Sequence, residues 1–345
     1  MMAETLYVVY PRDHQGHRPQ TFFNFGEMQD NLEKPERIEA IRTALSALPY
    51  VTISECERHA TPDELCAVHT PELVQYLTET LAEWDPGWPD EIVPGTFPYS
   101  FSTAKLPEWP LAQAAYFACD AGTPIGAGTV RAATASAGCA LQAAEAVVAG
   151  ASRLAYALCR PPGHHATRAR YGGFCYFNNA VLAAGRLASL GRVAVLDIDF
   201  HHGNGSQETT YRSDQVMYVS IHGDPNDSFP FFYGYAGERG EGTGEGYNLN
   251  LPLARGADWA AYQPALQRAL EAITDNDCRA LVISAGFDTC EGDPLGGLAL
   301  QPEDFQPIGA AIASLELPTV VVQEGGYVVE LLGRCAQALV TGLMG

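Results

Sequence analysis

The chain has 345 residues, and 47% of them are hydrophobic, which is enough to bury the core of one large α/β domain or two smaller ones. Its 41 acidic and 20 basic side chains give a formal net charge of −21, and such a field repels nucleic acid and attracts cations. The charge argues against a nucleic-acid partner and favours a cationic substrate, although a purely solubilising role is the simpler alternative.

The sequence contains no signal for secretion or for membrane insertion. No N-terminal stretch has the basic start, apolar centre and small-residue cleavage site of a signal peptide, and no segment is apolar over the length that spans a bilayer. The nine cysteines include no Cys-x-x-Cys pair, which predicts reduced thiols and neither a disulfide framework nor a cysteine zinc site. We therefore expect a soluble, cytoplasmic protein with no membrane partner.

The predicted elements begin with a strand at residues 6–10 and a helix near 35–47. Residues 84–110 are rich in proline, tryptophan and other aromatic residues. They predict a long ordered loop, and such loops in compact domains are usually functional. No linker composition divides the chain, so we expect a single domain over residues 1–345 with a loop excursion at about 84–110.

From about residue 129 onward, short β-branched runs alternate with alanine-rich stretches of helical length. Strands are predicted at 154–159, 193–198, 216–221, 280–284 and 318–322, and helices at 131–149, 179–190, 259–273 and 305–314. This alternation is typical of an α/β fold in which helices cover a parallel sheet.

Polar motifs follow the predicted strands one after another. Beyond the five strands lie R-P-P-G-H-H (160–165), D-F-H-H-G-N-G (199–205), H-G-D-P (222–225), A-G-F-D (285–288) and Q-E-G-G-Y (323–327). Open parallel sheets bind ligands beyond the carboxyl ends of their strands. The repetition of this pattern predicts a functional site at one edge of the sheet.

Two carboxylates and one imidazole among these motifs are candidate metal ligands. Asp199, His201 and Asp288 form a set of the catalytic type, which leaves a coordination position open for water. In an extended strand Asp197 would share a face with Asp199 and His201, and such groups repel unless a cation lies among them. Taken singly, Asp199 could instead cap a helix and His201 could be a surface histidine.

An arginase-like site with two metal ions is the alternative. Such sheets carry D-x-H-x-D and D-x-D at their strand ends. In this chain Gly203 and Cys290 occupy the third positions of the two motifs, so the second group of carboxylates is missing. One transition metal is the better interpretation, and zinc or ferrous iron would suit the ligands.

Candidate catalytic groups lie beside the metal set. His164 and His165 follow a stiff Pro-Pro-Gly turn, and an imidazole near a metal-bound water is the usual general base. Asp197 and Asn204 are candidates to orient this base. Two glycines before Tyr327 could present its phenol to polarise a carbonyl. Each of these groups could also be structural when taken alone.

The motifs in combination resemble the histone deacetylase family. They are R-P-P-G-H-H (160–165), G-G-F-C-Y-F-N-N (172–179), D-I-D-F-H-H-G-N-G-S-Q (197–207), S-A-G-F-D (284–288) and E-G-G-Y (324–327). H-G-D-P-N-D-S-F-P (222–230) is similar to the bacterial acetylpolyamine amidohydrolase or histone deacetylase-like amidohydrolase branch. The resemblance covers residues 129–330 densely and implies the arginase-deacetylase fold, with a central parallel eight-stranded sheet flanked by helices.

The resemblance implies a role for each matched residue. Asp199, His201 and Asp288 match zinc ligands, His164 and His165 match the catalytic pair, and Tyr327 matches the residue that polarises the amide. The matches to a structural K+ or Na+ site are Asp197, Asp199, His201, Ser220 and Ile221. The matches to a substrate channel are Gly173, Phe174, Phe229, Leu295 and, at its rim, Asp120.

Two departures from the family pattern concern the general base and the substrate. Asn204 stands where some members have an aspartate behind the second histidine, which leaves the pKa of His165 open. Leu295 occupies the place of an acidic gatekeeper in one polyamine-specific branch. That device for recognising a distant cationic nitrogen is therefore absent.

The resemblance implies a zinc-dependent hydrolase that removes acetyl groups from N-acetylated amines and gives acetate and a free amine. We expect a small cationic substrate such as an acetylpolyamine. An acetyl-lysine peptide or protein is the close alternative, and a non-catalytic binder of acetylated ligands is an alternative of a different class. We also expect a homodimer, because the region at 84–110 shapes a dimer in related amidohydrolases and could narrow the entrance.

Overall fold

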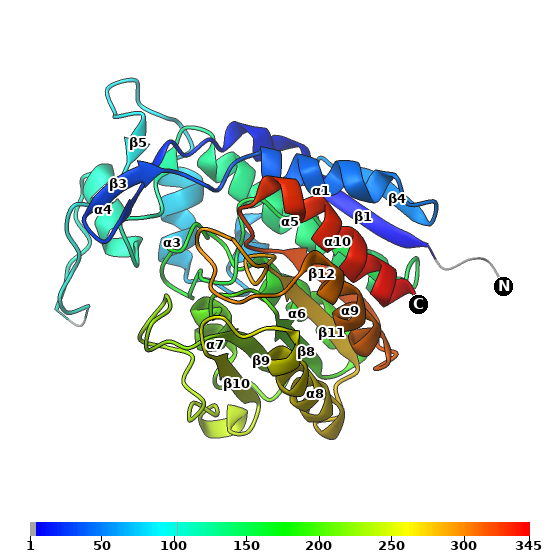
Figure 1. The fold of residues 1–345 in the computed structure, drawn as a ribbon. Helices are drawn as coiled ribbons and strands as arrows, with labels where there is room; N and C mark the ends of the chain where they lie inside the picture. The colour runs from blue at the N-terminus through cyan, green and yellow to red at the C-terminus, as the bar shows by residue number, and fades with distance from the viewer. Residues whose placement is uncertain (1–4, 102) are drawn as a thin grey trace.

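The computed structural model describes residues 5–101 and 103–345, and its centre is a parallel sheet of eight strands (Figure 1). The strands are β1 (Leu6–Pro11), β4 (Val51–Cys56), β7 (Leu154–Ala157), β8 (Val193–Asp197), β9 (Val216–Gly223), β10 (Asn248–Leu253), β11 (Ala280–Ala285) and β12 (Thr319–Gln323). Their order is β10-β9-β8-β11-β12-β7-β1-β4, and every neighbouring pair is parallel. The predicted fold class is confirmed.

Helices cover both faces of this sheet. On one face lie α1 (Glu36–Ser46), α8 (Trp259–Asp275), α9 (Phe305–Ala313) and α10 (Val329–Met344), and on the other lie α5 (Thr129–Val148) and α6 (Asn179–Leu187). The helix α1 turns Ile38, Ile41 and Leu45 toward the sheet, which is the spacing of one helix face. Burying each of these side chains stabilises the fold by about 1.5–3 kcal/mol.

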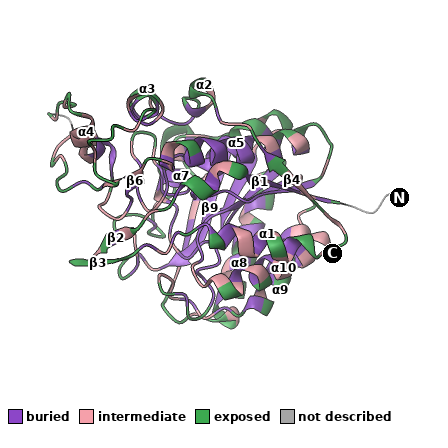
Figure 2. Ribbon diagram, turned by 90° about the horizontal axis from the view of Figure 1, so that it is seen from above, coloured by how far each residue is buried: buried purple, intermediate pink, exposed green. Residues whose placement is uncertain are grey.

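Most residues of the helix α5 are buried (Figure 2), because it packs against the sheet on one side and against a second group of helices on the other. Ala140, Ala143 and Ala144 pack toward the sheet, while Ala137 and Leu141 belong to a second core. The small side chains allow close approach of both layers. This second core includes α2 (Pro62–Leu65), α3 (Pro71–Gln75), the π-helix η2 (Tyr76–Thr80) and α4 (Pro110–Phe117).

The remaining elements are short. They are the pairs β2 (Thr21–Asn24) with β3 (Glu27–Asp30) and β5 (Glu91–Ile92) with β6 (Ile125–Gly126), the helix α7 (Asn204–Thr210), and the turns η1 (Arg12–Gly16), η3 (Ala188–Leu190), η4 (Gly242–Gly244) and η5 (Pro302–Asp304). Within 84–110 the described residues form loop, apart from β5 and the first residue of α4.

The boundaries of several predicted elements were wrong by a few residues. The strands β7 and β8 end at Ala157 and Asp197, before the polar motifs, and the helix predicted to residue 190 ends at Leu187 and continues as η3. The strands β4 and β10 and the helix α10 were not predicted.

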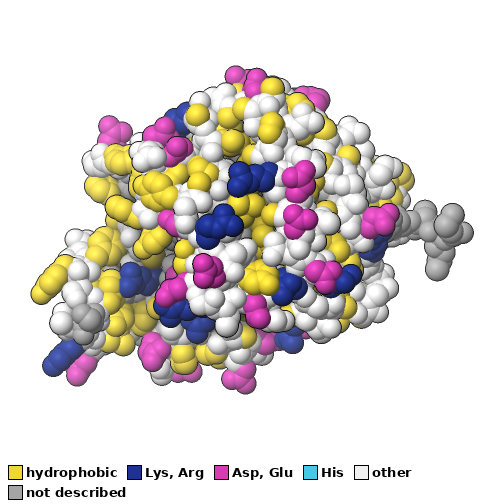
Figure 3. Space-filling model, turned by 90° about the horizontal axis from the view of Figure 1, so that it is seen from below, with side chains coloured by type: hydrophobic (Ala, Val, Ile, Leu, Met, Phe, Trp, Pro, Cys, Tyr) yellow, Lys and Arg dark blue, Asp and Glu magenta, His cyan; other side chains and the backbone are white. Residues whose placement is uncertain are grey.

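The surface carries charged side chains of both signs, as the composition of the chain leads one to expect. Figure 3 shows acidic and basic side chains interspersed with hydrophobic ones on one face of the molecule. In the part of the chain that the structure describes, no helix has both the length and the apolar character needed to cross a membrane.

Candidate active site

Four neighbouring strands of the sheet deliver the polar motifs to one place. The strands β8, β11, β12 and β7 are consecutive in the sheet and parallel. Their carboxyl ends therefore lie at the same edge, and the segments that follow them carry the two histidines, the three candidate ligands and the tyrosine.

The structure brings the three candidate metal ligands together. One ligand atom from each of Asp199, His201 and Asp288 lies within 4.8 Å of the other two. His201 Nδ1 lies 3.3 Å from Asp199 Oδ1 and 3.0 Å from Asp288 Oδ2. Both carboxylates are fully buried. This is a compact set of oxygen and nitrogen donors of the kind that binds zinc or ferrous iron.

The backbone around the set fixes the carboxylates. The N–H of Gly325 donates to Asp199 Oδ2 at 2.7 Å, and the N–H of Phe200 donates to Asp288 Oδ1 at 2.9 Å. Asp199 and His201 lie beyond the end of β8, so the alternation expected for one continuous strand was wrong after Asp197. Hydrogen bonds from other segments, and not strand geometry, orient these ligands.

The electrostatics of the set fit a bound cation. Burial and the negative charge of Asp199 raise the pKa of Asp288 to about 7. Among the residues that the structure describes, these two carboxylates contact the imidazoles of His164 and His201 and backbone N–H groups, and neither forms an ion pair with a Lys or Arg. A divalent cation among them would neutralise both charges, so the residues present fit a metal ion.

His165 has the environment of a general base. Asn204 Oδ1 lies 2.7 Å from His165 Nδ1, and an amide oxygen only accepts, so Nδ1 carries the hydrogen and Nε2 keeps its lone pair. Burial, together with the charge of His164, holds the pKa of His165 well below its usual value. The imidazole is therefore neutral near pH 7 and able to take a proton.

His164 has the opposite environment. Its Nδ1 lies 3.0 Å from Asp197 Oδ2. Burial lowers the pKa of His164, but the charges of Asp197 and Asp199 outweigh that effect and raise it to about 10. A cation beside Asp199 would reduce this shift. The two adjacent imidazoles, whose ring centres lie 4.0 Å apart, thus have pKa values shifted in opposite directions.

Glu324 and Arg37 complete the site, and the sequence analysis assigned neither a role. Glu324 Oε2 accepts from the N–H groups of Gly163 and His164 at 2.7 and 3.2 Å. Buried Arg37 donates to the carbonyl oxygens of Glu324 and Gly326, both at 2.6 Å. No local pattern marks Arg37, which lies 287 residues before Glu324.

Arg37 also helps to hold the segment that carries Tyr327. Its Cζ lies 4.8 Å from the centre of the Tyr327 ring, and the N–H of Tyr327 donates to Asp293 Oδ2 at 2.6 Å. Burial raises the pKa of the Tyr327 phenol well above its ordinary value. The phenol therefore keeps its proton and can donate a hydrogen bond to an oxyanion.

A cavity of about 440 Å³ leads from the surface to these groups. His165, His201 and Tyr327 line it, together with all five predicted channel residues, Gly173, Phe174, Phe229, Leu295 and Asp120. The ring of Phe229 lies 5.0 Å from that of His165, and the ring of Phe174 lies 6.0 Å from that of Tyr327. Apolar walls of this kind suit an aliphatic chain.

Gly173 and Asp120 shape the wall that carries Phe174. Gly173 has a φ of +56°, and a Cβ at this position would collide with the ring of His165, so only glycine fits. The Asp120 carboxylate accepts from the N–H of Gly122 and the hydroxyl of Thr123 through Oδ1, and from the N–H of Gly173 through Oδ2. In the structure Asp120 therefore supports the channel loop, which sequence reasoning did not anticipate.

The candidate monovalent-cation residues lie on adjacent strands. Asp197 pairs with Ser220 in the register of β8 and β9, and Ile221 follows. The Ser220 hydroxyl lies 2.8 Å from His222 Nδ1. Asp197 Oδ2 accepts from the hydroxyl of Tyr218 at 2.9 Å and lies 3.0 Å from His164 Nδ1. This oxygen is therefore already engaged, and backbone carbonyls would have to supply much of any cation coordination.

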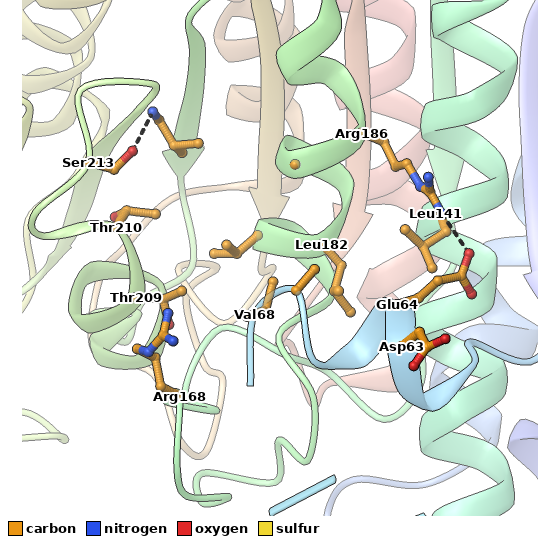
Figure 4. Close-up of a pocket in the computed structure, with 14 residues that line it drawn as sticks. Asp63, Glu64, Val68, Leu141, Arg168, Leu182, Arg186, Thr209, Thr210 and Ser213 are labelled. Atoms are coloured by element: carbon orange, nitrogen blue, oxygen red, sulfur yellow. Dashed lines mark hydrogen bonds and ion pairs between the residues drawn. The ribbon is translucent and has the colours of Figure 1, made fainter. Parts of the chain in front are cut away.

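A second cavity, of about 460 Å³, lies between α2, α5, α6 and α7 (Figure 4). Its charged residues include Glu64 and Arg186, whose side chains form an ion pair at 2.6 Å. None of the candidate catalytic or metal-binding residues lines it. The cavity at the strand ends is therefore the candidate active site.

Comparison with known proteins agrees with this geometry. The family model for the histone deacetylase domain matches residues 31–343. The chain belongs to the histone deacetylase family. The resemblance seen in the motifs is thereby confirmed, and it extends over the N-terminal part of the chain, where the motifs are thin.

Several bacterial members of the histone deacetylase family match the chain over nearly its whole length. It is 37% identical to acetylpolyamine amidohydrolase 2 of Pseudomonas aeruginosa over 99% of both chains. It is 42% identical to the acetylpolyamine amidohydrolase of Burkholderia pseudomallei over 96% of both. A crystal structure of acetylpolyamine aminohydrolase from Burkholderia pseudomallei superposes with a TM-score of 0.92 at 40% identity, covering 98% of each chain.

Proposed function

We propose that this protein is a metal-dependent deacetylase of small N-acetylated amines, with acetylpolyamines as the favoured substrates. The observation that carries the proposal is the set of Asp199, His201 and Asp288, of which His201 lines the cavity with apolar walls beside a neutral His165. The acetylpolyamine amidohydrolases among the relatives support the substrate class.

The three ligands would hold a zinc ion, or ferrous iron, which supplies Lewis-acid activation of water and of the acetyl carbonyl. His165 Nε2 takes a proton from the attacking water, since Nδ1 is occupied by Asn204. The Tyr327 hydroxyl donates to the developing oxyanion. His164, with a raised pKa, holds a proton that can pass to the leaving amine. Water adds to the acetyl carbon, the C–N bond breaks, and acetate and the amine leave.

The first experiment measures acetate release from acetylputrescine, acetylspermidine, acetylcadaverine and an acetyl-lysine peptide, with and without a chelator. We expect turnover of the small amines that a chelator abolishes and added zinc restores. Asp288→Ala should be inactive, whereas Asp277→Ala, which removes an exposed aspartate paired with Arg279, should match the wild type. Faster turnover of the peptide would favour the acetyl-lysine alternative, and a silent panel from folded, zinc-loaded protein would favour a non-catalytic binder.

We further propose that the protein is a homodimer in which the entrance region meets a second copy. Phe25 at the turn between β2 and β3 is 85% exposed and Tyr99 is fully exposed, and such aromatic side chains are typical of interfaces. Light scattering should give twice the mass of 37.1 kDa. A monomer at micromolar concentration would contradict the proposal.

We also propose that a K+ or Na+ ion binds near Asp197, Ser220 and Ile221, and that the protein is located in the cytoplasm.

A further inference from the structure

The outer end of the cavity carries an ion pair that the deacetylation chemistry does not use. Asp227, two residues before Phe229, and Arg255, in the turn between β10 and α8, both line the cavity. Arg255 Nε lies 3.7 Å from Asp227 Oδ1, and the two side chains are 50% and 54% exposed. A carboxylate and a guanidinium thus stand side by side where the cavity meets solvent.

The position of Arg255 is set by its surroundings. Its Cζ lies 5.6 Å from the centre of the Phe200 ring, and its Nη1 donates to the carbonyl oxygen of Gly296 at 3.3 Å. A Cβ on Gly297 would collide with Nη1, so glycine at this position leaves room for the guanidinium. Phe200 in turn contacts His201, with ring centres 5.0 Å apart. The distance from the Arg255 guanidinium to the His201 ring therefore cannot exceed the sum of the Arg255–Phe200 and Phe200–His201 distances. A chain as long as a lysine side chain can span it.

The pair is loose enough to bind a ligand. A separation of 3.7 Å is too long for a hydrogen bond, and half-exposed opposite charges attract each other only weakly. Asp227 Oδ1 is oriented by the hydroxyl of Ser228 at 2.8 Å. Replacing the contact between Arg255 and Asp227 by contacts to a substrate therefore costs little free energy.

The chemistry of the pair fits a zwitterion. Arginine binds carboxylates through two parallel hydrogen bonds, and Asp227 beside it can accept from an ammonium group. The head of a free amino acid presents both groups on one carbon atom. A polyamine tail, in contrast, offers only cations, which Asp227 attracts and Arg255 repels.

We propose that the same site also hydrolyses free Nε-acetylated amino acids of the acetyl-lysine type, with Arg255 binding the α-carboxylate and Asp227 the α-ammonium group. The inference rests on the proposed deacetylase function. The reaction is the same hydrolysis: water adds to the acetyl carbonyl, the Nε–C bond breaks, and the products are acetate and the free amino acid.

Four substrates that share one aliphatic chain separate the two charges. Nε-acetyl-lysine carries both, N-acetylcadaverine only the ammonium, N-acetyl-6-aminohexanoate only the carboxylate, and N-acetylpentylamine neither. The measurement is kcat/KM for each, in the wild type and in Arg255→Gln and Asp227→Asn. Arg268→Gln, which changes an exposed arginine of α8 outside this cavity, is the matched control.

We expect Arg255→Gln to lower the ratio of kcat/KM for acetyl-lysine to that for acetylpentylamine by about tenfold, which corresponds to about 1.4 kcal/mol of binding free energy. The same variant should raise the ratio for acetylcadaverine. Asp227→Asn should lower the ratios for both ammonium-bearing substrates. The change should appear in KM, because the head binds equally in the ground state and the transition state, and Arg268→Gln should leave all ratios unchanged.

Ratios that do not respond to Arg255→Gln, or that fall equally for charged substrates of both signs, would overturn the inference. Turnover of acetylpentylamine by the wild type shows that the deacetylase itself works. If acetylpentylamine is turned over but the ratios for the charged substrates do not change as expected, only the role of Arg255 and Asp227 is contradicted. No turnover of any of the four substrates by metal-loaded protein would contradict the proposed function, and the inference with it.

Discussion

At the scale of single residues, the site works through contrasts between similar groups. His164 and His165 are neighbours in sequence, yet one faces the carboxylate of Asp197 and the other the amide of Asn204. The carboxylate of Asp197 raises the pKa of His164, whereas the pKa of His165 is lowered, mainly by burial. The proposed division between a proton donor and a base therefore depends on these partners and not on the histidines themselves.

Replacement of Asn204 by aspartate tests this division. In Asn204→Asp a carboxylate would face His165 Nδ1 and favour the imidazolium, so the pKa of His165 should rise by about one unit or more. Since the base must be neutral, the acidic limb of the pH profile of kcat/KM should move to higher pH by the same amount. Steady-state rates between pH 5 and 9 measure the limb. Asn204→Ser, which adds no charge, is the control, and an unmoved limb would show that His165 is not the base.

Removal of the Tyr327 hydroxyl tests its role as an oxyanion donor. Tyr327→Phe keeps the ring in contact with Phe174 and Arg37 but deletes the donor. We expect kcat to fall by roughly 10²–10³-fold, the loss typical of one such hydrogen bond, with metal content unchanged. Acetate release and elemental analysis together check this. A kcat within a factor of three of the wild type would contradict the assignment.

At the scale of elements, one buried histidine joins the second core to the segment behind the catalytic pair. His69, between α2 and α3, accepts at Nε2 from the N–H of Asn178 at 2.9 Å, while its Nδ1 donates to the carbonyl oxygen of Thr167 at 2.8 Å. A protonated ring would place an N–H against the N–H of Asn178. Burial accordingly lowers the pKa of His69 to about 4.

This lowered pKa predicts a loss of stability in acid. Above pH 6.5 His69 is neutral in both states, so its contribution is fully present. As the pH falls from 6.5 toward 4, the unfolded chain binds a proton that the folded protein does not, and the free energy of unfolding falls by about 3 kcal/mol. Urea unfolding at pH 7 and pH 4 measures the difference. In His69→Gln, which keeps a donor and an acceptor, the pH dependence should be smaller by this amount; an identical dependence would contradict the prediction.

At the scale of the whole molecule, the candidate metal ligands Asp199 and Asp288 follow the ends of β8 and β11, two central strands of the sheet. Because Asp199 and Asp288 are buried in the folded protein alone, a cation that binds them stabilises the fold by mass action. At 100 to 1,000 times its Kd the gain is about 3–4 kcal/mol. Thermal unfolding with zinc and with a chelator should show the difference in Tm. Asp288→Asn should remove most of the zinc dependence, and a Tm indifferent to zinc in the wild type would count against the metal site.

The alternation of strands and helices and the parallel sheet could be predicted from the sequence, and the sequence also indicated the residues of the candidate site. These features depend on patterns that are local in the chain, namely β-branched runs and the motifs directly after them. The missed elements have weaker local signals: β4, V-T-I-S-E-C, lies at one edge of the sheet and β10, N-L-N-L-P-L, at the other.

The partners that surround the candidate site became known from the folded structure. Arg37 comes from the first helix and reaches the backbone of Glu324 and Gly326. Asp120 turns inward to the N–H of Gly173, and Arg255 reaches the rim beside Asp227 from a separate turn. These contacts join segments that are distant in the chain, and no short sequence pattern encodes them. They arise when packing of the sheet and its helices brings the segments together and leaves each buried polar group to find a partner.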